Sequence, residues 1–383
     1  MPIDPFEVRI PQAALDGLRE RLAHTRWPDQ LLDSGWGYGS ELSYMKELVD
    51  YWQGGFDWRA QEDAINSYAH FRAGVDGLGI HFIHERGRGA NPMPLIVTHG
   101  WPGSFYEMLK IIPLLTDPAG HGGDANDSFD VVVPSLPGYG FSDRPTRPGM
   151  SKSRIAEIWQ QLMTEVLGYR RFGAHGGDIG AGVTTKLGLN HPARLLGIHI
   201  TAVANPYLGP GTAPLTEAER DFVEFTQHWE TEEGAYGHIQ ATRPQTLAYG
   251  LNDSPAGLAA WIVEKFRAWS DCGGQVESRF TKDELLTNIT IYWVTETINS
   301  SIRLYADNRL QPPGFKEGER ITVPCGIALT REKIDQVPRE WAERSYNVQR
   351  WTEFPRGGHF AAMEEPELLV EDIREFFRPL RSQ

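Results

Sequence analysis

Short apolar runs alternate with stretches of helical spacing along most of this chain. A typical helical stretch carries Ile155, Ile158, Trp159, Leu162 and Val166 along one face. Strands that alternate with helices in this way form a mostly parallel sheet covered on both faces. The apolar runs lie at residues 95–98, 129–136, 169–174, 196–203 and 321–329. We therefore predict an α/β protein.

The first part of the chain has a different pattern. Two helical patterns, at residues 11–24 and 41–52, stand among many aromatic residues and contain no cluster of candidate reactive groups. Residues 71–84 then alternate with a period of two around Asp76-Gly77, a typical hairpin turn. We predict that residues 1–70 form a helical meander that packs on the rest of the protein.

The alternation of strands and helices stops between residues 205 and 315. This segment has a mostly helical pattern rich in aromatic residues, and it lies between two strands of the predicted sheet. Ligands of open α/β sheets bind at the carboxyl ends of the strands, which an insertion at this place would cover. We predict a helical lid at 205–315, inserted late in the sheet, which divides the core into residues 71–204 and 316–383.

A glycine-rich turn at residues 172–183, FGAHGGDIGAGV, joins an apolar run to a segment that is helix-compatible from about residue 182. It has the shape of the nucleophile elbow of α/β-hydrolases, G-x-S-x-G, with Asp178 in place of the serine. A carboxylate with a reference pKa of about 4 is ionised at neutral pH and can attack an alkyl carbon without a base. The alternative is a surface aspartate at a helix N-terminus.

An ester on Asp178 has to be hydrolysed, which requires a general base and an oxyanion hole. His359 lies in the loop Arg356-Gly-Gly-His-Phe before the last helix, and we predict that it is the base. A carboxylate should orient it from the loop after residue 329, where Glu332 and Asp335 are the candidates. The backbone N–H groups of Ile179 and Trp101 are expected to form the oxyanion hole.

Four blocks of the sequence resemble one family. HGWPGSFYE, GGDIG, LNDSPAGLAAWIVEKF and RGGHFAAMEEPELL are similar to the microsomal-type epoxide hydrolases, and the similarity covers essentially the whole chain. That family has an α/β-hydrolase core clamped by an N-terminal meander. The resemblance implies trans-addition of water to an epoxide through a covalent alkyl-enzyme.

The resemblance also implies which lid residues act. Two tyrosines, carried over as Tyr236 and Tyr305, would donate hydrogen bonds to the epoxide oxygen as it leaves as an alkoxide. The family spacing counted back from His359 lands on Glu332, and counted back from Trp341 it lands on Lys333. We therefore prefer Glu332 as the acid and keep Asp335 as the alternative. A homodimer is a further expectation of the resemblance.

Composition and charge exclude several classes of partner. The net charge of −14 argues against nucleic acid and anionic membranes. Two cysteines give no disulfide framework, the N-terminus lacks a secretory signal, and no run is apolar enough to cross a bilayer, so we expect a cytoplasmic protein. Pro137-Gly-Tyr-Gly resembles half of a dinucleotide motif, but prolines follow it instead of a helix. We expect no cofactor and no metal.

The substrate is expected to be a small hydrophobic epoxide, with water as the second reactant. The aromatic residues Trp229, Trp261 and Trp293 in the predicted lid favour a bulky apolar substrate, although they could also form the core of the lid. One alternative is a haloalkane dehalogenase, which would bind halide through tryptophan or asparagine N–H groups such as that of Trp101. The other is a catalytically silent member of the fold that only binds a ligand.

Overall fold

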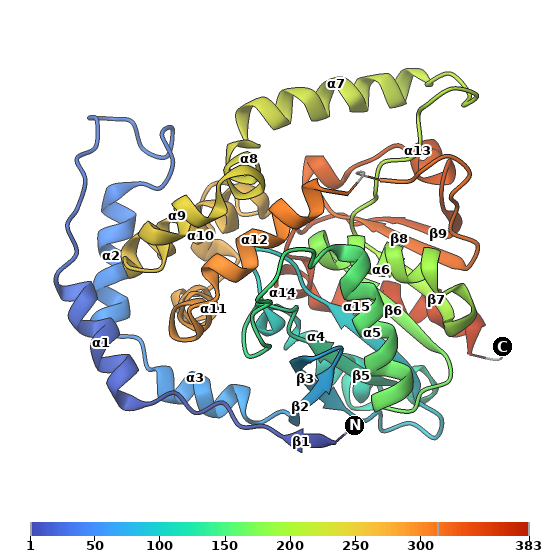
Figure 1. Cartoon of the computed structure of the whole chain (residues 1–383), viewed down its shortest axis with the longest axis horizontal. Helices are drawn as coiled ribbons and strands as arrows, with labels where there is room; N and C mark the ends of the chain where they lie inside the picture. Colours follow the sequence, from blue (N-terminus) through green and yellow to red (C-terminus); the bar gives the residue numbers. More distant parts are fainter. Residues whose placement is uncertain (1, 312–313, 382–383) are drawn as a thin grey trace.

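The centre of the protein is a single twisted sheet (Figure 1). The structure is a computed structural model that describes residues 2–311 and 314–381. Within those ranges the sheet has nine strands in the order β1-β2-β3-β5-β4-β6-β7-β8-β9. The strands are β1 (Ile3–Pro5), β2 (His70–Val75), β3 (Leu78–Glu85), β4 (Met93–Thr98), β5 (Phe129–Pro134), β6 (Phe172–Gly176), β7 (Leu195–Ile200), β8 (Pro324–Leu329) and β9 (Asn347–Glu353).

The sheet is mostly parallel, as predicted. Strands β5, β4, β6, β7, β8 and β9 run parallel to their neighbours, while β1, β2 and β3 form an antiparallel edge that joins the sheet at β5. Every residue of β5 and β6 is buried, as expected for central strands covered on both faces. Strand β9 and the short β1 were not predicted from the sequence.

Helices cover both faces of the sheet. The core helices are α4 (Ile111–Thr116), α5 (Lys152–Gln161), α6 (Asp178–Asn190), α13 (Arg339–Glu343), α14 (Ala361–Glu364) and α15 (Pro366–Phe377). Neighbouring residues of a strand point to opposite faces. On β7, Ile198 lies against Gly188 of α6, whereas His199 bonds Asp372 of α15. Helices α6 and α15 therefore lie on opposite sides of the sheet.

A group of helices lies between β7 and β8, where the sequence predicted a helical insertion. We call this group the helical insertion; it comprises α7 (Glu217–Glu232), α8 (Ala235–Thr242), α9 (Pro244–Leu251), α10 (Pro255–Trp269), α11 (Lys282–Thr295) and α12 (Ile298–Arg309). Its helices gather on one side of the sheet in Figure 1. Its role as a lid, and the division of the chain at residues 70, 204 and 315, remain predictions.

The N-terminal segment contacts both other parts of the protein. Helices α1 (Gln12–Ala23) and α2 (Leu42–Gly54) lie beside α10 of the helical insertion, and α3 (Trp58–Ile65) follows them. Strand β1 pairs with β2 at the edge of the sheet. The segment thus runs along one flank of the molecule, in blue in Figure 1. No helix in the described ranges is long and apolar enough to cross a bilayer.

Candidate active site

Asp178 stands at a sharp turn between β6 and α6. The sequence predicted a helix from about residue 182, but α6 begins at Asp178 itself. The backbone φ of Asp178 is +48°, in the left-handed region that residues other than glycine rarely adopt. A Cβ on Gly180 would lie 2.0 Å from the Thr98 carbonyl oxygen, so the turn requires glycine there. The strain and close packing fix the Asp178 side chain above the sheet.

One member of the predicted oxyanion hole is hydrogen-bonded to the Asp178 carboxylate. Its Oδ1 accepts a hydrogen bond of 2.8 Å from the backbone N–H of Trp101, which lies in the loop after β4. Gly100 allows this approach, since a Cβ there would lie 2.4 Å from Oδ1. Ile179, the second predicted member, follows Asp178 in the first turn of α6. The positive end of that helix also favours a negative charge at this place.

His359 lies between two carboxylates. Its Nε2 is 3.8 Å from Asp178 Oδ2, and its Nδ1 is 3.1 Å from Asp335 Oδ2. Asp178, Asp335 and His359 follow β6, β8 and β9 respectively, so the carboxyl ends of three parallel strands bring them together. The imidazole and the Asp335 carboxylate are nearly buried, with side chains 11% and 8% exposed. The arrangement is that of a nucleophile, a base and an orienting acid.

The structure contradicts the preference for Glu332 as the partner of His359. Residues Lys333–Asp335 form one turn of 3-10 helix, and the side chain of Asp335 points from it to the imidazole. Glu332 has an extended backbone and lies just before this turn. Burial and the neighbouring Asp335 raise the pKa of Glu332 to about 7, although His359 opposes the shift. In the structure the alternative residue, Asp335, and not Glu332, is therefore the carboxylate in contact with His359.

Exchanging the two carboxyl groups for amides should separate their roles. We expect Asp335→Asn to slow hydrolysis of the ester by about 10²- to 10⁴-fold, because the imidazole loses its orienting anion. Glu332→Gln should slow it less than about tenfold, since Glu332 makes no hydrogen bond to His359 in the described structure. The rate constant of a single turnover measures both effects. A larger loss in Glu332→Gln would restore Glu332 as the acid.

The charges around His359 control its protonation. Burial alone lowers the pKa of His359, but Asp335, Asp178 and Glu107 together raise it to about 10. At neutral pH the resting imidazole is therefore protonated and cannot accept a proton. An ester on Asp178 removes one of these negative charges, so the pKa of His359 must fall once the ester forms. The base becomes available at the step that needs it.

This coupling predicts a change in the titration of His359. Asp178→Asn keeps the shape of the carboxylate without its charge, so the pKa of His359 in this variant should lie below the value of about 10 expected for the unmodified protein. NMR titration of histidine-labelled protein measures the pKa of His359 in the variant and in the unmodified protein. The rate of ester hydrolysis should correspondingly fall on the acid side, below that lowered pKa. Equal midpoints in the two proteins would contradict the coupling.

The predicted tyrosines come from two helices of the insertion. Tyr236 is on α8 and Tyr305 on α12, and their ring centroids are 6.1 Å apart. The Trp101 ring stacks on Tyr236 at 5.4 Å and meets Tyr305 edge-on at 6.0 Å. Burial raises the pKa of both phenols, and the negative charge of Asp178 adds to the shift. Both hydroxyls therefore keep their protons at neutral pH and can donate them.

A cavity of about 290 Å³ connects these groups. Asp178, Asp335, His359 and Tyr236 all line it, and the Tyr305 ring meets the Tyr236 ring edge-on, with 6.1 Å between the centroids. Its remaining lining is mainly apolar and includes Trp229 and Trp269, together with residues 202–204 after β7.

Two of the three tryptophans proposed from the sequence as substrate contacts lie elsewhere. Trp261 donates to Gln240, and the Trp293 ring lies beside Arg21. Only Trp229 of the three lines the cavity. The aromatic content of the insertion therefore says less about the size of the substrate than the sequence suggested.

Sequence patterns did not reveal the residue that holds the His359 loop. Glu364 is buried and accepts hydrogen bonds from the backbone N–H groups on both sides of His359, at 2.9 Å from Gly358 and 3.1 Å from Phe360. The N–H of His359 donates to the Trp269 carbonyl, 2.8 Å away. The acidic pair Glu364-Glu365, in an otherwise apolar segment just after the histidine, is the signal that could have revealed it.

A second carboxyl group near the site also went unpredicted. Glu107 is buried beside the loop that carries Trp101, where a Cβ on Gly103 would lie 2.2 Å from its Oε2. Burial and the charge of Asp178 raise the pKa of Glu107 to about 7, although His359 opposes the shift. In the described part of the chain, no group of three or more His, Cys, Asp or Glu residues is arranged to hold a metal ion.

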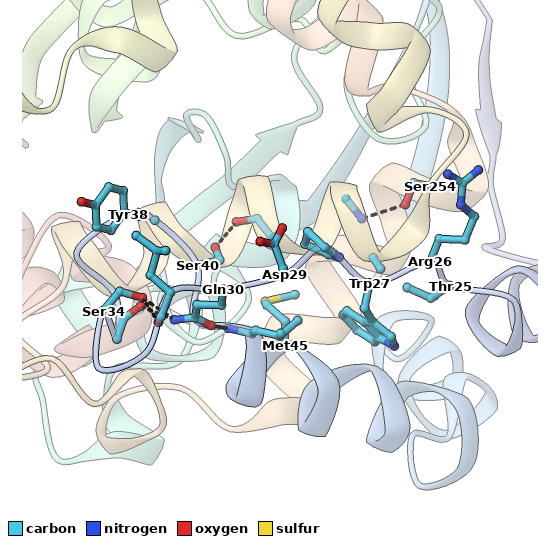
Figure 2. Close-up of a pocket in the computed structure, with 18 residues that line it drawn as sticks. Thr25, Arg26, Trp27, Asp29, Gln30, Ser34, Tyr38, Ser40, Met45 and Ser254 are labelled. Carbon is cyan, nitrogen blue, oxygen red and sulfur yellow. Dashed lines mark hydrogen bonds between the residues drawn. The ribbon is translucent and has the colours of Figure 1, made fainter.

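A roomier cavity, of about 520 Å³, lies away from these groups. It is enclosed by the segment 25–45 and by the start of α10, and Figure 2 shows Trp27, Tyr38 and Met45 around it. One of its polar side chains, Gln30, is already bonded to Ser34, Gly35 and Leu42. None of the predicted reactive residues lines this cavity, so the chemistry of the lining, and not the volume, identifies the site.

Comparison with known proteins gives a consistent result. Residues 3–108 match the family described as epoxide hydrolase N terminus, and residues 93–258 match the alpha/beta hydrolase fold. Epoxide hydrolase 1 of the pig, Sus scrofa, is 39% identical over 408 residues, which cover 100% of this chain and 90% of the pig protein. Juvenile hormone epoxide hydrolase 2 of the flea Ctenocephalides felis is 36% identical over 96% of this chain and 84% of its own length.

Solved structures with the same architecture include two epoxide hydrolases. The enzyme of Aspergillus niger superposes with a TM-score of 0.84 at 28% identity, covering 99% of this chain and 97% of that chain. Juvenile hormone epoxide hydrolase of the silkworm Bombyx mori superposes with a TM-score of 0.83 at 29% identity, covering 100% of this chain and 94% of that chain. The similarity thus includes the N-terminal segment and the helical insertion as well as the sheet.

Proposed function

The chain belongs to the epoxide hydrolase family, enzymes that add water to an epoxide to give a vicinal diol, and we propose that it does so through an ester on Asp178. The observation that carries the proposal is the position of Asp178 in the elbow, with His359 Nε2 3.8 Å from its carboxylate. A charged carboxylate in this place is a nucleophile, and a histidine held by a second carboxylate is a base for a later step.

The first step opens the epoxide. An Asp178 oxygen attacks one epoxide carbon and forms a carbon–oxygen bond, while the bond from that carbon to the epoxide oxygen breaks. The oxygen leaves as an alkoxide, and a proton from Tyr236 or Tyr305 neutralises it. Both phenols belong to the helical insertion, opposite Asp178. Loss of the Asp178 charge in this step then lowers the pKa of His359, so the imidazolium releases its proton, and that proton restores the phenol.

The second step hydrolyses the ester. His359, oriented by Asp335, takes a proton from water, and the resulting hydroxide adds to the Asp178 carboxyl carbon. The N–H groups of Trp101 and Ile179 stabilise the oxyanion that develops; Trp101 N is already 2.8 Å from Oδ1. Collapse of this intermediate breaks the bond from the carboxyl carbon to the diol oxygen, which takes the proton of the new carboxyl group. The diol is released, the carboxylate is restored with one oxygen of Asp178 now derived from solvent, and His359 is again protonated.

The alternatives from the sequence fit less well. A dehalogenase needs N–H donors for halide, whereas two phenols stand above this elbow, and the relatives in the comparisons are named epoxide hydrolases. A silent binding protein has no need of the Asp178, His359 and Asp335 constellation. The apolar walls of the cavity support a substrate with a hydrophobic body. The homodimer and the cytoplasmic location remain predictions.

One turnover in heavy-oxygen water tests the ester directly. With enzyme in excess over epoxide, the first diol should carry no solvent oxygen, because its new oxygen comes from Asp178. Mass spectrometry of the peptide that contains Asp178 should instead show the heavy isotope in the carboxylate. Direct attack of water would label the first diol and leave the peptide unlabelled.

A further inference from the structure

Lys152 lines the active-site cavity, and the proposed mechanism does not use it. It is the first residue of α5, where the Ser151 hydroxyl caps the helix and the Lys152 backbone N–H is bonded to Asn308 at 2.9 Å. The start of the side chain is therefore fixed, and the ammonium extends into the same cavity that holds Asp178 and His359. A lysine in a pocket with mainly apolar walls requires an explanation.

Space for the Lys152 side chain comes from a glycine on the neighbouring helix. Gly182 lies one turn after Asp178 on α6 and also lines the cavity. A Cβ on Gly182 would lie 2.5 Å from Lys152 Cδ and 3.0 Å from its Nζ, so any other residue would displace the lysine. Lys152 and Gly182 thus form one feature: the end of the lysine lies over the glycine, within the cavity.

The ammonium group forms no salt bridge with the residues that the structure describes. The chain has 51 acidic and 37 basic residues, yet no carboxylate in the described ranges lies within 4.0 Å of Lys152 Nζ. Burial lowers the pKa of Lys152, the charge of Asp178 opposes the shift, and Lys186 adds to it. The side chain of Lys152 is only partly exposed, and its ammonium group forms no salt bridge in the described ranges, so an anion bound in the cavity would supply the missing charge partner.

We propose that Lys152 binds the carboxylate of an anionic epoxide, and that the preferred substrate therefore has an apolar body, an epoxide and one carboxylate. A single ammonium matches a monoanion better than a dianionic phosphate. The body would lie against Trp229 and residues 202–204, with the epoxide beside Asp178 and the carboxylate at Lys152. The inference rests on the proposed function, because it names the substrate class of that same site.

Matched substrates test this assignment. Styrene oxide and 4-carboxystyrene oxide differ only in the charged group, and the ratio of their kcat/KM values isolates its contribution. Lys152→Met keeps the length of the side chain without its charge. We expect this variant to reduce the ratio of kcat/KM for the charged epoxide to kcat/KM for the neutral epoxide by about 10- to 100-fold. This is the usual effect of losing a charged hydrogen bond. Lys152→Arg should retain most of the preference.

Lys186→Met is the control for a general change in the electrostatic potential near the cavity. Lys186 is near enough to affect the pKa of Lys152 but does not line the cavity, so the ratio should change less than about threefold. The affinities for benzoate and for benzamide can be measured by calorimetry without any turnover. Their ratio should show the same dependence on Lys152.

Each outcome distinguishes the two proposals. Equal losses of kcat/KM for both epoxides in Lys152→Met would show that the lysine acts on Asp178 and not on the substrate. That result would overturn the inference but would not contradict the proposed function. An equal effect of Lys186→Met would overturn it as well. Failure of the unmodified enzyme to hydrolyse either epoxide, despite binding benzoate through Lys152, would count against the proposed reaction instead.

Discussion

Replacing Asp178 with asparagine should reduce turnover by at least about 10⁴-fold. The amide has the same shape but no negative charge, so it cannot form the ester that the reaction passes through. Its carbonyl oxygen can still accept the 2.8 Å hydrogen bond from Trp101, which means that the elbow should keep its geometry. Diol formation from an epoxide measures the loss, and circular dichroism checks that the variant is folded.

Asp16→Asn provides the matched control for this variant. Asp16 is an exposed carboxylate on α1, with 61% of its side chain accessible, and it lies far along the chain from the elbow. The control should keep nearly full activity, because exposed ion pairs contribute little. More than a few per cent of normal turnover in a folded Asp178→Asn protein would show that another group attacks the epoxide.

Replacing His359 with glutamine should separate the two steps of the reaction. Attack by Asp178 needs no base, so the ester should still form, but its hydrolysis should slow by about 10³-fold or more. The protein should then gain a mass equal to that of the epoxide, and consumption of epoxide should stop after about one equivalent per site, with little diol released. Intact-protein mass spectrometry measures the adduct, and the digested peptide locates it.

A double variant, Asp178→Asn with His359→Gln, controls for adducts at other nucleophiles and should gain no mass. An adduct of equal yield in the double variant would mean that some other side chain reacts. Absence of an adduct in His359→Gln, in a protein that still binds epoxide, would mean that the imidazole is needed for ring opening. Either result would remove the two-step scheme.

The sequence predicted those parts of the protein that depend on local patterns. Alternating strands and helices gave the mostly parallel sheet, and the glycine-rich turn and the histidine loop identified Asp178 and His359, which the structure brings to 3.8 Å. Glu332 and Asp335 could not be separated, because both lie in one short loop. A single 3-10 turn decides which carboxylate faces the imidazole.

Contacts between side chains of different helices and loops could not be predicted from sequence patterns. Lys152 and Gly182 lie thirty residues apart, and only the packing of α5 on α6 places the lysine over the glycine. Glu364 was missed for a related reason, since its role is to accept two backbone N–H groups in a loop whose conformation no periodicity encodes. Local propensity gives the elements, whereas tertiary contacts select the partners.

The hydrogen bonds between α10 and the His359 loop limit where the active site can open. The last residue of α10, Trp269, accepts the N–H of His359, and Glu364 bonds the N–H of Asp271 just beyond that helix. A displacement of α10 would therefore pull the base away from Asp178. By contrast, α7 buries a single residue, Glu219, which is held by Arg344. We therefore expect substrate and diol to pass beside α7, since α10 has to stay in place to hold the base.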